Sequence, residues 1–287
     1  MKLGILGGSG LYAMPALAGA HRHAQETPWG WPSDVVVEGE IGGLPVAFIA
    51  RHGQGHVLAP GEINYRANIA ALKARGCTAV VSVAACGSFV DELPPGSVAV
   101  PHQLVDRTVG RAKSFFGEGM VVHASMGHPV SVELGARIAD AARDAGAAVE
   151  VGGTYLAIEG PQFATRAESL LAKAQGMTVV GMTAMPEAAL CREAEMAYAV
   201  AAFVTDFDSW KDEAVTTAAV LEVMAGNVAR SQALVEGLCR SLAARPLAVP
   251  SAEGWEVALD SAIVTARGHW PVAAAARLRA LAPRFFD

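Results

Sequence analysis

The hydrophobic positions of the chain fall into two alternating patterns. Continuous apolar runs predict strands, and apolar residues that recur every three or four positions predict helices. The run from Met196 to Val204 has hardly a polar side chain and is typical of a strand buried on both faces of a parallel sheet. The predicted strands span Lys2–Leu6, Val35–Glu40, Val46–Ala50, Ala79–Ala85, Ser97–Val100, Thr154–Ile158, Thr178–Met182 and Ala199–Val204, and the predicted helices span Ile63–Ala74, Val130–Ala145, Thr165–Ala174, Glu187–Ala194 and Asp212 to about Ala244.

The order of these elements indicates an α/β fold, because mixed strands and helices favour a sheet flanked by helices. The strands Val35–Glu40 and Val46–Ala50 are joined by only five residues, which predicts an antiparallel hairpin and therefore a mixed sheet. Residues 1–245 are predicted to form a single domain. Several prolines and glycines follow it, so residues 246–287 are predicted to form a C-terminal extension with a short helix from about Val272 to Leu281.

Composition and charge narrow the class of protein. The chain has 287 residues, of which 52% are apolar, enough to bury a large core. Its formal net charge of −6 is unclustered, and nothing basic enough for a nucleic-acid surface is present. No uncharged apolar run reaches the roughly 18 residues that cross a bilayer. The N-terminal run is too short for a signal peptide, so we expect a cytoplasmic protein without nucleic-acid or membrane partners.

The cysteines and the hydropathy add further expectations. Cys77, Cys86, Cys191 and Cys239 lie far apart without a CxxC pair, which favours reduced core thiols over disulfides or zinc ligands. The His and Asp spacings form no recognisable ligand set, so no metal is predicted. The mean hydropathy of +0.32 is high for a soluble monomer, and apolar surface is often hidden between subunits.

Two carboxylates follow the longest apolar run, in the pentapeptide Asp206-Phe207-Asp208-Ser209-Trp210. Ligands of open α/β sheets lie beyond the carboxyl ends of strands, so both carboxylates are candidate site residues. In an extended segment, residues i and i+2 point to the same side, and two acceptors at that spacing suit a donor-bearing edge such as a purine base. The alternative is that both residues only cap the next helix.

Other strand ends predict an anion site. The turn Gly7-Gly8-Ser9-Gly10 follows the first strand, and its backbone amides and the Ser9 hydroxyl suit a phosphate. Arg51 and His52 follow the strand Val46–Ala50, and an arginine offers phosphate a bidentate contact. The backbone at Ala84-Ala85 could meet the same anion.

The glycine-rich turn has two alternative interpretations. It also matches a dinucleotide-binding fingerprint, but that motif needs a following helix and an acidic residue after the next strand. Here the next segment carries several prolines and a hairpin follows, which disfavours a dinucleotide. A plain tight turn without a ligand remains compatible with the sequence.

The motifs together resemble one family. They are Gly7-Gly8-Ser9-Gly10-Leu11, Ala50-Arg51-His52-Gly53, Asn64-Tyr65-Arg66-Ala67-Asn68, Glu159-Gly160-Pro161-Gln162-Phe163, Thr165-Arg166-Ala167-Glu168, Gly181-Met182-Thr183 with Pro186-Glu187, and Thr205-Asp206-Phe207-Asp208-Ser209-Trp210. In this order, over residues 3 to about 240, they resemble the trimeric purine nucleoside phosphorylases, and specifically the methylthioadenosine phosphorylase branch.

The resemblance implies a fold, an assembly and a reaction. The fold is the nucleoside phosphorylase fold, a mixed, partly barrel-like central sheet flanked by helices, and the assembly is a homotrimer. The reaction is the phosphorolysis of 5'-methylthioadenosine to adenine and 5-methylthioribose 1-phosphate, as in purine and methionine salvage. Inorganic phosphate is then a co-substrate, and no cofactor is implied.

The resemblance also implies roles for individual residues. Phe163 and Met182 would pack against base and ribose, Asp206 and Asp208 would read adenine, and His123 would be lent to the 5' pocket of a neighbouring subunit. Ala84 and Ala164 stand where relatives often have hydroxyl residues, so donors to phosphate or ribose are lost. The implied phosphate site consists of Ser9, Arg51, His52, the Ala84 and Ala85 backbone, and Thr183.

The chemistry of a purine leaving group supports the same assignment. Cleavage leaves positive charge on ribose and negative charge on the base, so a nucleophilic anion is needed on one side and a proton donor on the other. Asp206 would share or donate a proton at purine N7, and Asp208 would accept from a 6-amino group. The alternatives are a phosphorylase for 6-oxo nucleosides such as 5'-methylthioinosine, and a non-catalytic purine-binding protein.

Overall fold

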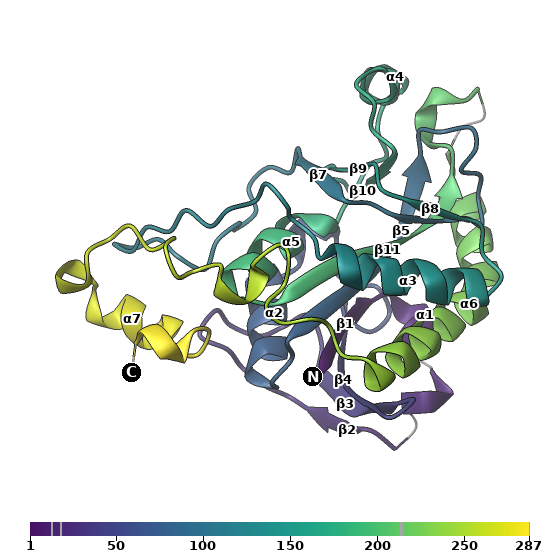
Figure 1. The fold of residues 1–287 in the computed structure, drawn as a ribbon. Coiled ribbons are helices and arrows are strands. Elements are labelled where there is room, and N and C mark those ends of the chain that lie inside the picture. Colours follow the sequence, from purple (N-terminus) through teal and green to yellow (C-terminus); the bar gives the residue numbers. More distant parts are fainter. Residues whose placement is uncertain (13, 18, 213–214, 287) are drawn as a thin grey trace.

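The computed structural model describes residues 1–12, 14–17, 19–212 and 215–286, without the side chains of Ser9 and Tyr12. Within them, one eleven-stranded mixed sheet runs through the molecule between helices (Figure 1). The strands are β1 (Leu3–Gly7), β2 (His21–His23), β3 (Val36–Ile41), β4 (Leu44–Ala50), β5 (Ala79–Ser88), β6 (Val98–Val100), β7 (Gln103–Asp106), β8 (Val149–Val151), β9 (Thr154–Ala157), β10 (Val179–Gly181) and β11 (Ala197–Asp206). The helices are α1 (Ser9–Tyr12), α2 (Tyr65–Ala74), α3 (Val132–Asp144), α4 (Arg166–Ala174), α5 (Ala184–Glu193), α6 (Thr217–Ala244) and α7 (Val272–Leu278).

Four parallel strands form the centre of the sheet, in the order β4-β1-β5-β11. Their carboxyl ends therefore lie at one edge. β3 pairs with β4 antiparallel, as the short connection predicted. β5 has a third partner, because its last residues pair antiparallel with β10. The sheet thus branches at β5, and the predicted mixed α/β fold is confirmed.

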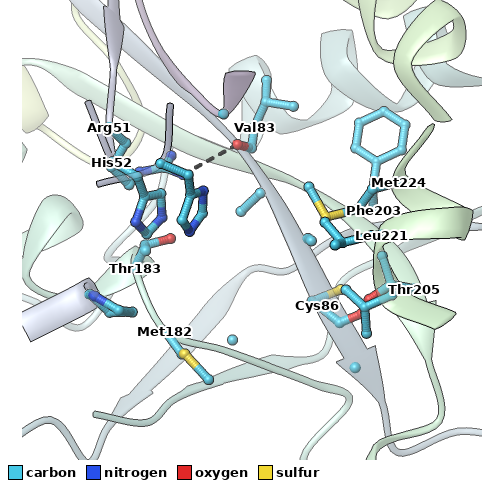
Figure 2. Close-up of a pocket in the computed structure, with 18 of the residues that line it drawn as sticks. Arg51, His52, Val83, Cys86, Met182, Thr183, Phe203, Thr205, Leu221 and Met224 are labelled. Carbon is cyan, nitrogen blue, oxygen red and sulfur yellow. Dashed lines mark hydrogen bonds between the residues drawn. The ribbon is translucent and has the colours of Figure 1, made fainter. Parts of the chain in front are cut away.

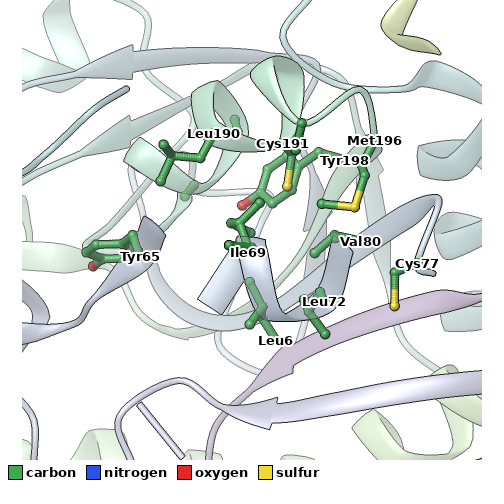
Figure 3. Packing of buried hydrophobic residues seen from close by; sticks show 14 of the residues in the cluster. Leu6, Tyr65, Ile69, Leu72, Cys77, Val80, Leu190, Cys191, Met196 and Tyr198 are labelled. Atoms are coloured by element: carbon green, nitrogen blue, oxygen red, sulfur yellow. The ribbon is translucent and has the colours of Figure 1, made fainter. Parts of the chain in front are cut away.

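The central strands are buried on both faces, and their side chains alternate between two cores. On β11, Tyr198, Val200 and Ala202 face the core that contains Ile69 of α2 and Leu190 of α5 (Figure 3). Ala199, Ala201 and Phe203 face the opposite core, with residues of α3 and α6. This period of two, with apolar residues at every position, explains why the strand appears in the sequence as one continuous apolar run.

The predicted elements are present, and the differences have local causes. The missed strands β2, β7 and β8 have only three or four residues each, several of them exposed, so no apolar pattern marks them. The long helix begins at Thr217 and not at Asp212, since the Thr216 side chain accepts from the Ala219 amide as its N-cap. Residues 213 and 214, inside the predicted helix, lie outside the described residues.

The C-terminal segment packs against the rest of the chain. The amide of Val264 donates to the Val121 carbonyl at 2.9 Å, and α7 ends at Leu278, three residues before the predicted end. The division of the chain at residue 245 stays a prediction. No described helix has the length and hydropathy needed to span a membrane.

Candidate active site

A cavity of about 880 Å³ lies at the carboxyl ends of the central parallel strands. Figure 2 shows Arg51, His52 and Thr183 on one side of it, and Phe203, Leu221 and Met224 on the other. Nine of the eleven predicted site residues line this cavity: Arg51, His52, Ala84, Ala85, Phe163, Met182, Thr183, Asp206 and Asp208.

The two remaining predicted residues are placed differently. The Ser9 side chain lies outside the described residues, although its neighbours Gly8 and Gly10 line the cavity. His123 does not line this cavity; its amide donates to the carbonyl of Ala262, a residue of the C-terminal segment, at 2.9 Å.

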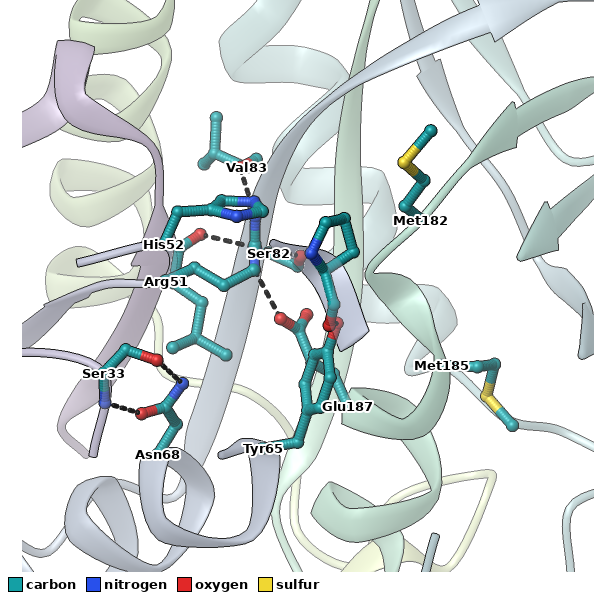
Figure 4. A network of polar contacts seen from close by, with 12 residues as sticks. Ser33, Arg51, His52, Tyr65, Asn68, Ser82, Val83, Met182, Met185 and Glu187 are labelled. Atoms are coloured by element: carbon teal, nitrogen blue, oxygen red, sulfur yellow. Dashed lines mark hydrogen bonds and ion pairs between the residues drawn. The ribbon is translucent and has the colours of Figure 1, made fainter. Parts of the chain in front are cut away.

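Arg51 is buried, and most of its donors are engaged within the protein (Figure 4). Its Nε donates to Glu187, its Nη1 to the Val83 carbonyl at 3.3 Å, and its Nη2 to the Leu6 carbonyl and the Ser82 hydroxyl. Among the described residues these bonds use four of its five N–H groups, so one on Nη1 is left for a ligand. This differs from the expected bidentate contact, because the second arm of the fork is bonded to the protein.

The charge of Arg51 is held in place by the same network. Burial by itself would lower the pKa of Arg51. The electrostatic effect of Glu187 and Tyr198 is larger in total, so the pKa of Arg51 is raised. Tyr198 donates to the second oxygen of Glu187 at 2.9 Å. Arg51 is therefore a fixed cation at the cavity wall, positioned before any anion binds.

His52 presents one ring nitrogen to the cavity side. Its Nδ1 lies 2.9 Å from the Leu58 carbonyl, which can only accept, so Nδ1 carries a hydrogen. Burial and the neighbouring Arg51 charge lower its pKa to about 4, so the ring is neutral at pH 7. Its Nε2 is then an acceptor, able to receive a hydrogen bond from a protonated oxygen of a bound phosphate.

Asp206 and Asp208 lie at the other end of the cavity, held by a turn. Asp206 ends β11, whereas Asp208 has a φ of +53° and begins a short 3-10 helix, η3 (Asp208–Trp210). The expectation that both carboxylates share one face of an extended segment is thus wrong, because the chain turns between them. The Asp208 amide donates to Asp206 Oδ1 at 2.7 Å, and this turn places both residues on the cavity wall.

Both carboxyl groups bind protons more tightly than usual. Burial raises the pKa of Asp206 against the opposing effect of hydrogen bonds from Thr205 and the Asp208 amide. Burial also raises the pKa of Asp208, and the nearby Asp206 charge adds to this shift while the Ser169 hydroxyl opposes it. Because α6 is capped by Thr216, the alternative that these carboxylates cap that helix is wrong.

Strand β5 connects the two ends of the cavity. Residues Val83 to Gly87 all line the cavity, with Arg51 bonded to the Val83 carbonyl at one end and Asp206 paired with Gly87 at the other. A Cβ on Gly87 would lie 2.8 Å from Asp206 Oδ1, so glycine is needed there. Val83 and Gly87 are separated by four residue steps, or about 13 Å of strand.

Some residues that line the cavity or hold its lining side chains in place were not predicted as site residues from the sequence. Glu187 fixes Arg51, and Ser169 of α4 donates to Asp208 Oδ2. One wall comes from α6, and the helical spacing of its cavity-lining residues was the available signal. These residues are Thr217, Val220, Leu221, Met224, Ala225, Asn227, Val228 and Ser231. Among the described residues, no group of three or more His, Cys, Asp or Glu could hold a metal ion.

The fold and the cavity define a class of protein: the chain belongs to the phosphorylase superfamily, whose family model matches residues 2–240. The S-methyl-5'-thioadenosine phosphorylase of Bradyrhizobium diazoefficiens is 49% identical to it, over 92% of this chain and 91% of its own. The protein of that name from Cereibacter sphaeroides is 47% identical, over 98% and 97% of the two chains. The resemblance inferred from the motifs is confirmed.

Solved structures agree with this membership. A methylthioadenosine phosphorylase sourced from an antarctic soil metagenomic library has a TM-score of 0.91 and 41% identity, over 98% of both chains. The methylthioadenosine phosphorylase from Schistosoma mansoni, solved in complex with adenine, has a TM-score of 0.85 and 35% identity, over 92% of this chain and 99% of that one.

Proposed function

We propose that this protein cleaves the glycosidic bond of 5'-methylthioadenosine with inorganic phosphate, giving adenine and 5-methylthioribose 1-phosphate. The observation that carries the proposal is the cavity along β5, where the Arg51 cation is bonded to Val83 and Asp206 pairs with Gly87, about 13 Å further along the strand. A ribose fits between a phosphate and a purine held at these two ends. The names of the relatives support the same substrate.

The anion end would hold the nucleophile. Arg51 would donate its remaining N–H to phosphate, and His52 Nε2 would accept from a protonated phosphate oxygen. Backbone amides of the glycine-rich turn would add donors, as would Thr183. A phosphate oxygen attacks C1' of the ribose, the bond from C1' to N9 breaks, and its electron pair passes into the purine.

The carboxyl end would bind and activate the leaving base. Asp206, with its raised pKa, would donate or share a proton at N7, where negative charge develops. Asp208 would accept from the 6-amino group with a lone pair that Ser169 does not use. A 6-oxo purine would set an acceptor against this carboxylate, so 6-amino purines are favoured.

One incubation tests the proposal. The protein is mixed with methylthioadenosine, methylthioinosine, adenosine and inosine, each with and without phosphate, and base release is followed. We expect adenine release from methylthioadenosine that requires phosphate. Phosphate-independent release would indicate a hydrolase, and binding without release would indicate a purine-binding protein.

Arg51→Lys tests the anion end. We expect the KM for phosphate to rise by about tenfold, because lysine keeps the charge but cannot reach both the protein acceptors and the ligand. Lysine is preferable to alanine here, since an unpaired buried Glu187 would cost about 3 to 5 kcal/mol of stability. Arg192→Lys, which alters a buried arginine outside the cavity, is the control. An unchanged KM for phosphate in Arg51→Lys would refute the anion site.

We further propose a cytoplasmic homotrimer. Four buried free thiols suit a reducing compartment, and exposed valines at 57, 109 and 121 leave apolar surface for subunit contacts. Light scattering is expected to give three times the chain mass of 29.6 kDa. A stable, active monomer at working concentration would contradict the assembly and any role of His123 in a neighbouring site.

A further inference from the structure

Arg111 is a buried arginine that the reaction scheme does not use. Its side chain is only 2% exposed, and it comes from the loop after β7, outside the cavity lining. Its guanidinium nevertheless donates to three segments that are far apart in the sequence. The acceptors are Glu159 Oε2 at 3.1 Å, the Glu159 carbonyl at 2.6 Å, the Met182 carbonyl at 2.6 Å, the Met185 carbonyl at 3.0 Å and the Tyr65 hydroxyl at 3.0 Å.

Each acceptor adjoins a wall of the cavity. Glu159 precedes the loop that carries Pro161 and Phe163, and Met182 itself lines the cavity. The Tyr65 hydroxyl donates to the carbonyl of Pro60, a third wall residue, at 2.9 Å. One guanidinium thus joins three walls by hydrogen bonds. Figure 4 shows Tyr65, Met182 and Met185 beside the Arg51 network.

The geometry of a guanidinium makes this junction rigid. Its donors lie in one plane at fixed angles, so the acceptors cannot shift independently without losing bonds. Partly buried carbonyls of irregular segments need donors, and those of Glu159 and Met182 receive them from Arg111. The distance between the Phe163 loop and the Met182 segment is therefore tied to one side chain.

Resting on the function proposed above, we propose that Arg111 is a positioning residue that sets nucleoside affinity by holding the Phe163 loop and the Met182 segment on either side of the base and ribose. Its bonds to the Met182 and Met185 carbonyls flank Thr183, but Arg111 makes no described contact with Thr183 itself or with the network that fixes the proposed phosphate-binding residues Arg51 and His52. The partners that fix Arg51 and His52 are Glu187, Ser82 and the carbonyls of Leu6, Val83 and Leu58, and none of these described contacts involves Arg111.

The test compares Arg111→Lys with Arg192→Lys. Arg192 is also buried and donates to backbone carbonyls, those of Glu253 and His128, but it lies outside the cavity lining. We expect Arg111→Lys to raise the KM for methylthioadenosine by about tenfold while the KM for phosphate changes by less than about twofold. Adenine binding, measured by calorimetry, should weaken by about the same factor as the nucleoside. Arg192→Lys should lower the melting temperature without changing either KM.

Tyr65→Phe is the second variant, and it covers the case in which Arg111→Lys does not fold. It removes the hydroxyl that accepts from Arg111 and donates to the Pro60 carbonyl. A smaller rise of about threefold in the KM for methylthioadenosine is therefore expected. Equal changes in the two KM values, or no change in either variant that folds, would overturn the positioning role. Absence of phosphorolysis in the unaltered protein would instead refute the proposed function.

Discussion

Asp206→Asn is expected to lower the turnover of every purine nucleoside by about a hundredfold, because the group that assists departure of the base can no longer give up an acidic proton. The fold should tolerate the change. Asn keeps one oxygen for the Asp208 amide, and Thr205 can turn its hydroxyl to the Cys86 carbonyl, which already lies 3.2 Å away. Initial rates with methylthioadenosine and methylthioinosine at saturating phosphate measure the effect.

The pH profile gives an independent readout for this variant. The raised pKa keeps Asp206 protonated to higher pH than an ordinary aspartate, so activity that needs the acid form falls as the pH rises through that pKa. Asp206→Asn should lack this fall, while the titration of phosphate itself remains common to both proteins. Asp212→Asn, at a side chain that is 97% exposed, is the control and should match the unaltered protein. A wild-type rate in Asp206→Asn would remove Asp206 from the reaction.

Asp208→Asn is expected to change base preference more than overall activity. Ser169 donates to Asp208 Oδ2 and would hold the single oxygen of Asn, which turns the amide NH₂ toward the base. A donor then faces the 6-position, so the ratio of methylthioinosine to methylthioadenosine turnover should rise by about ten- to a hundredfold. The ratio of kcat/KM for the two nucleosides measures this directly.

Ser169 gives a matched control for that prediction. Ser169→Ala removes the hydroxyl that orients residue 208, so Ser169→Ala combined with Asp208→Asn should shift the ratio less than Asp208→Asn alone. An equal ratio in the unaltered protein and Asp208→Asn would mean that Asp208 does not read the 6-position.

The central strands could be predicted from the sequence, because strands that are buried on both faces appear as continuous apolar runs. β5 and β11 are covered on both faces, so their apolar runs mark them without tertiary information. β7 and β8 carry no such run, because they have three or four residues each and none of these is fully buried. Their pairing with β9 and β6 determines their conformation. The start of α6 depends on the cap at Thr216, and the sequence does not distinguish this residue from its neighbour Thr217.

Only part of the site could be predicted, because only some of its residues stand next to an apolar run. Arg51, His52 and Asp206 stand directly after apolar runs, where a charged residue is conspicuous. Glu187 and Arg111 lie on a helix and a loop with ordinary composition, and only the folded chain brings them to Arg51 and Met182. Which oxygen or N–H is engaged, as at Arg51, is a property of the assembled network and leaves no pattern in the sequence.

The cavity's dependence on β5 has a consequence for the size of ligand that this protein accepts. The Val83 carbonyl, to which Arg51 donates, and Gly87, which pairs with Asp206, belong to one strand, and this strand pairs with β1, β10 and β11. The distance between Val83 and Gly87 is therefore fixed by the extended backbone of β5, and movement of the surrounding loops does not change it. Discrimination against ligands with a longer or shorter spacer between anion and base should persist, undiminished by warming, until the sheet itself unfolds.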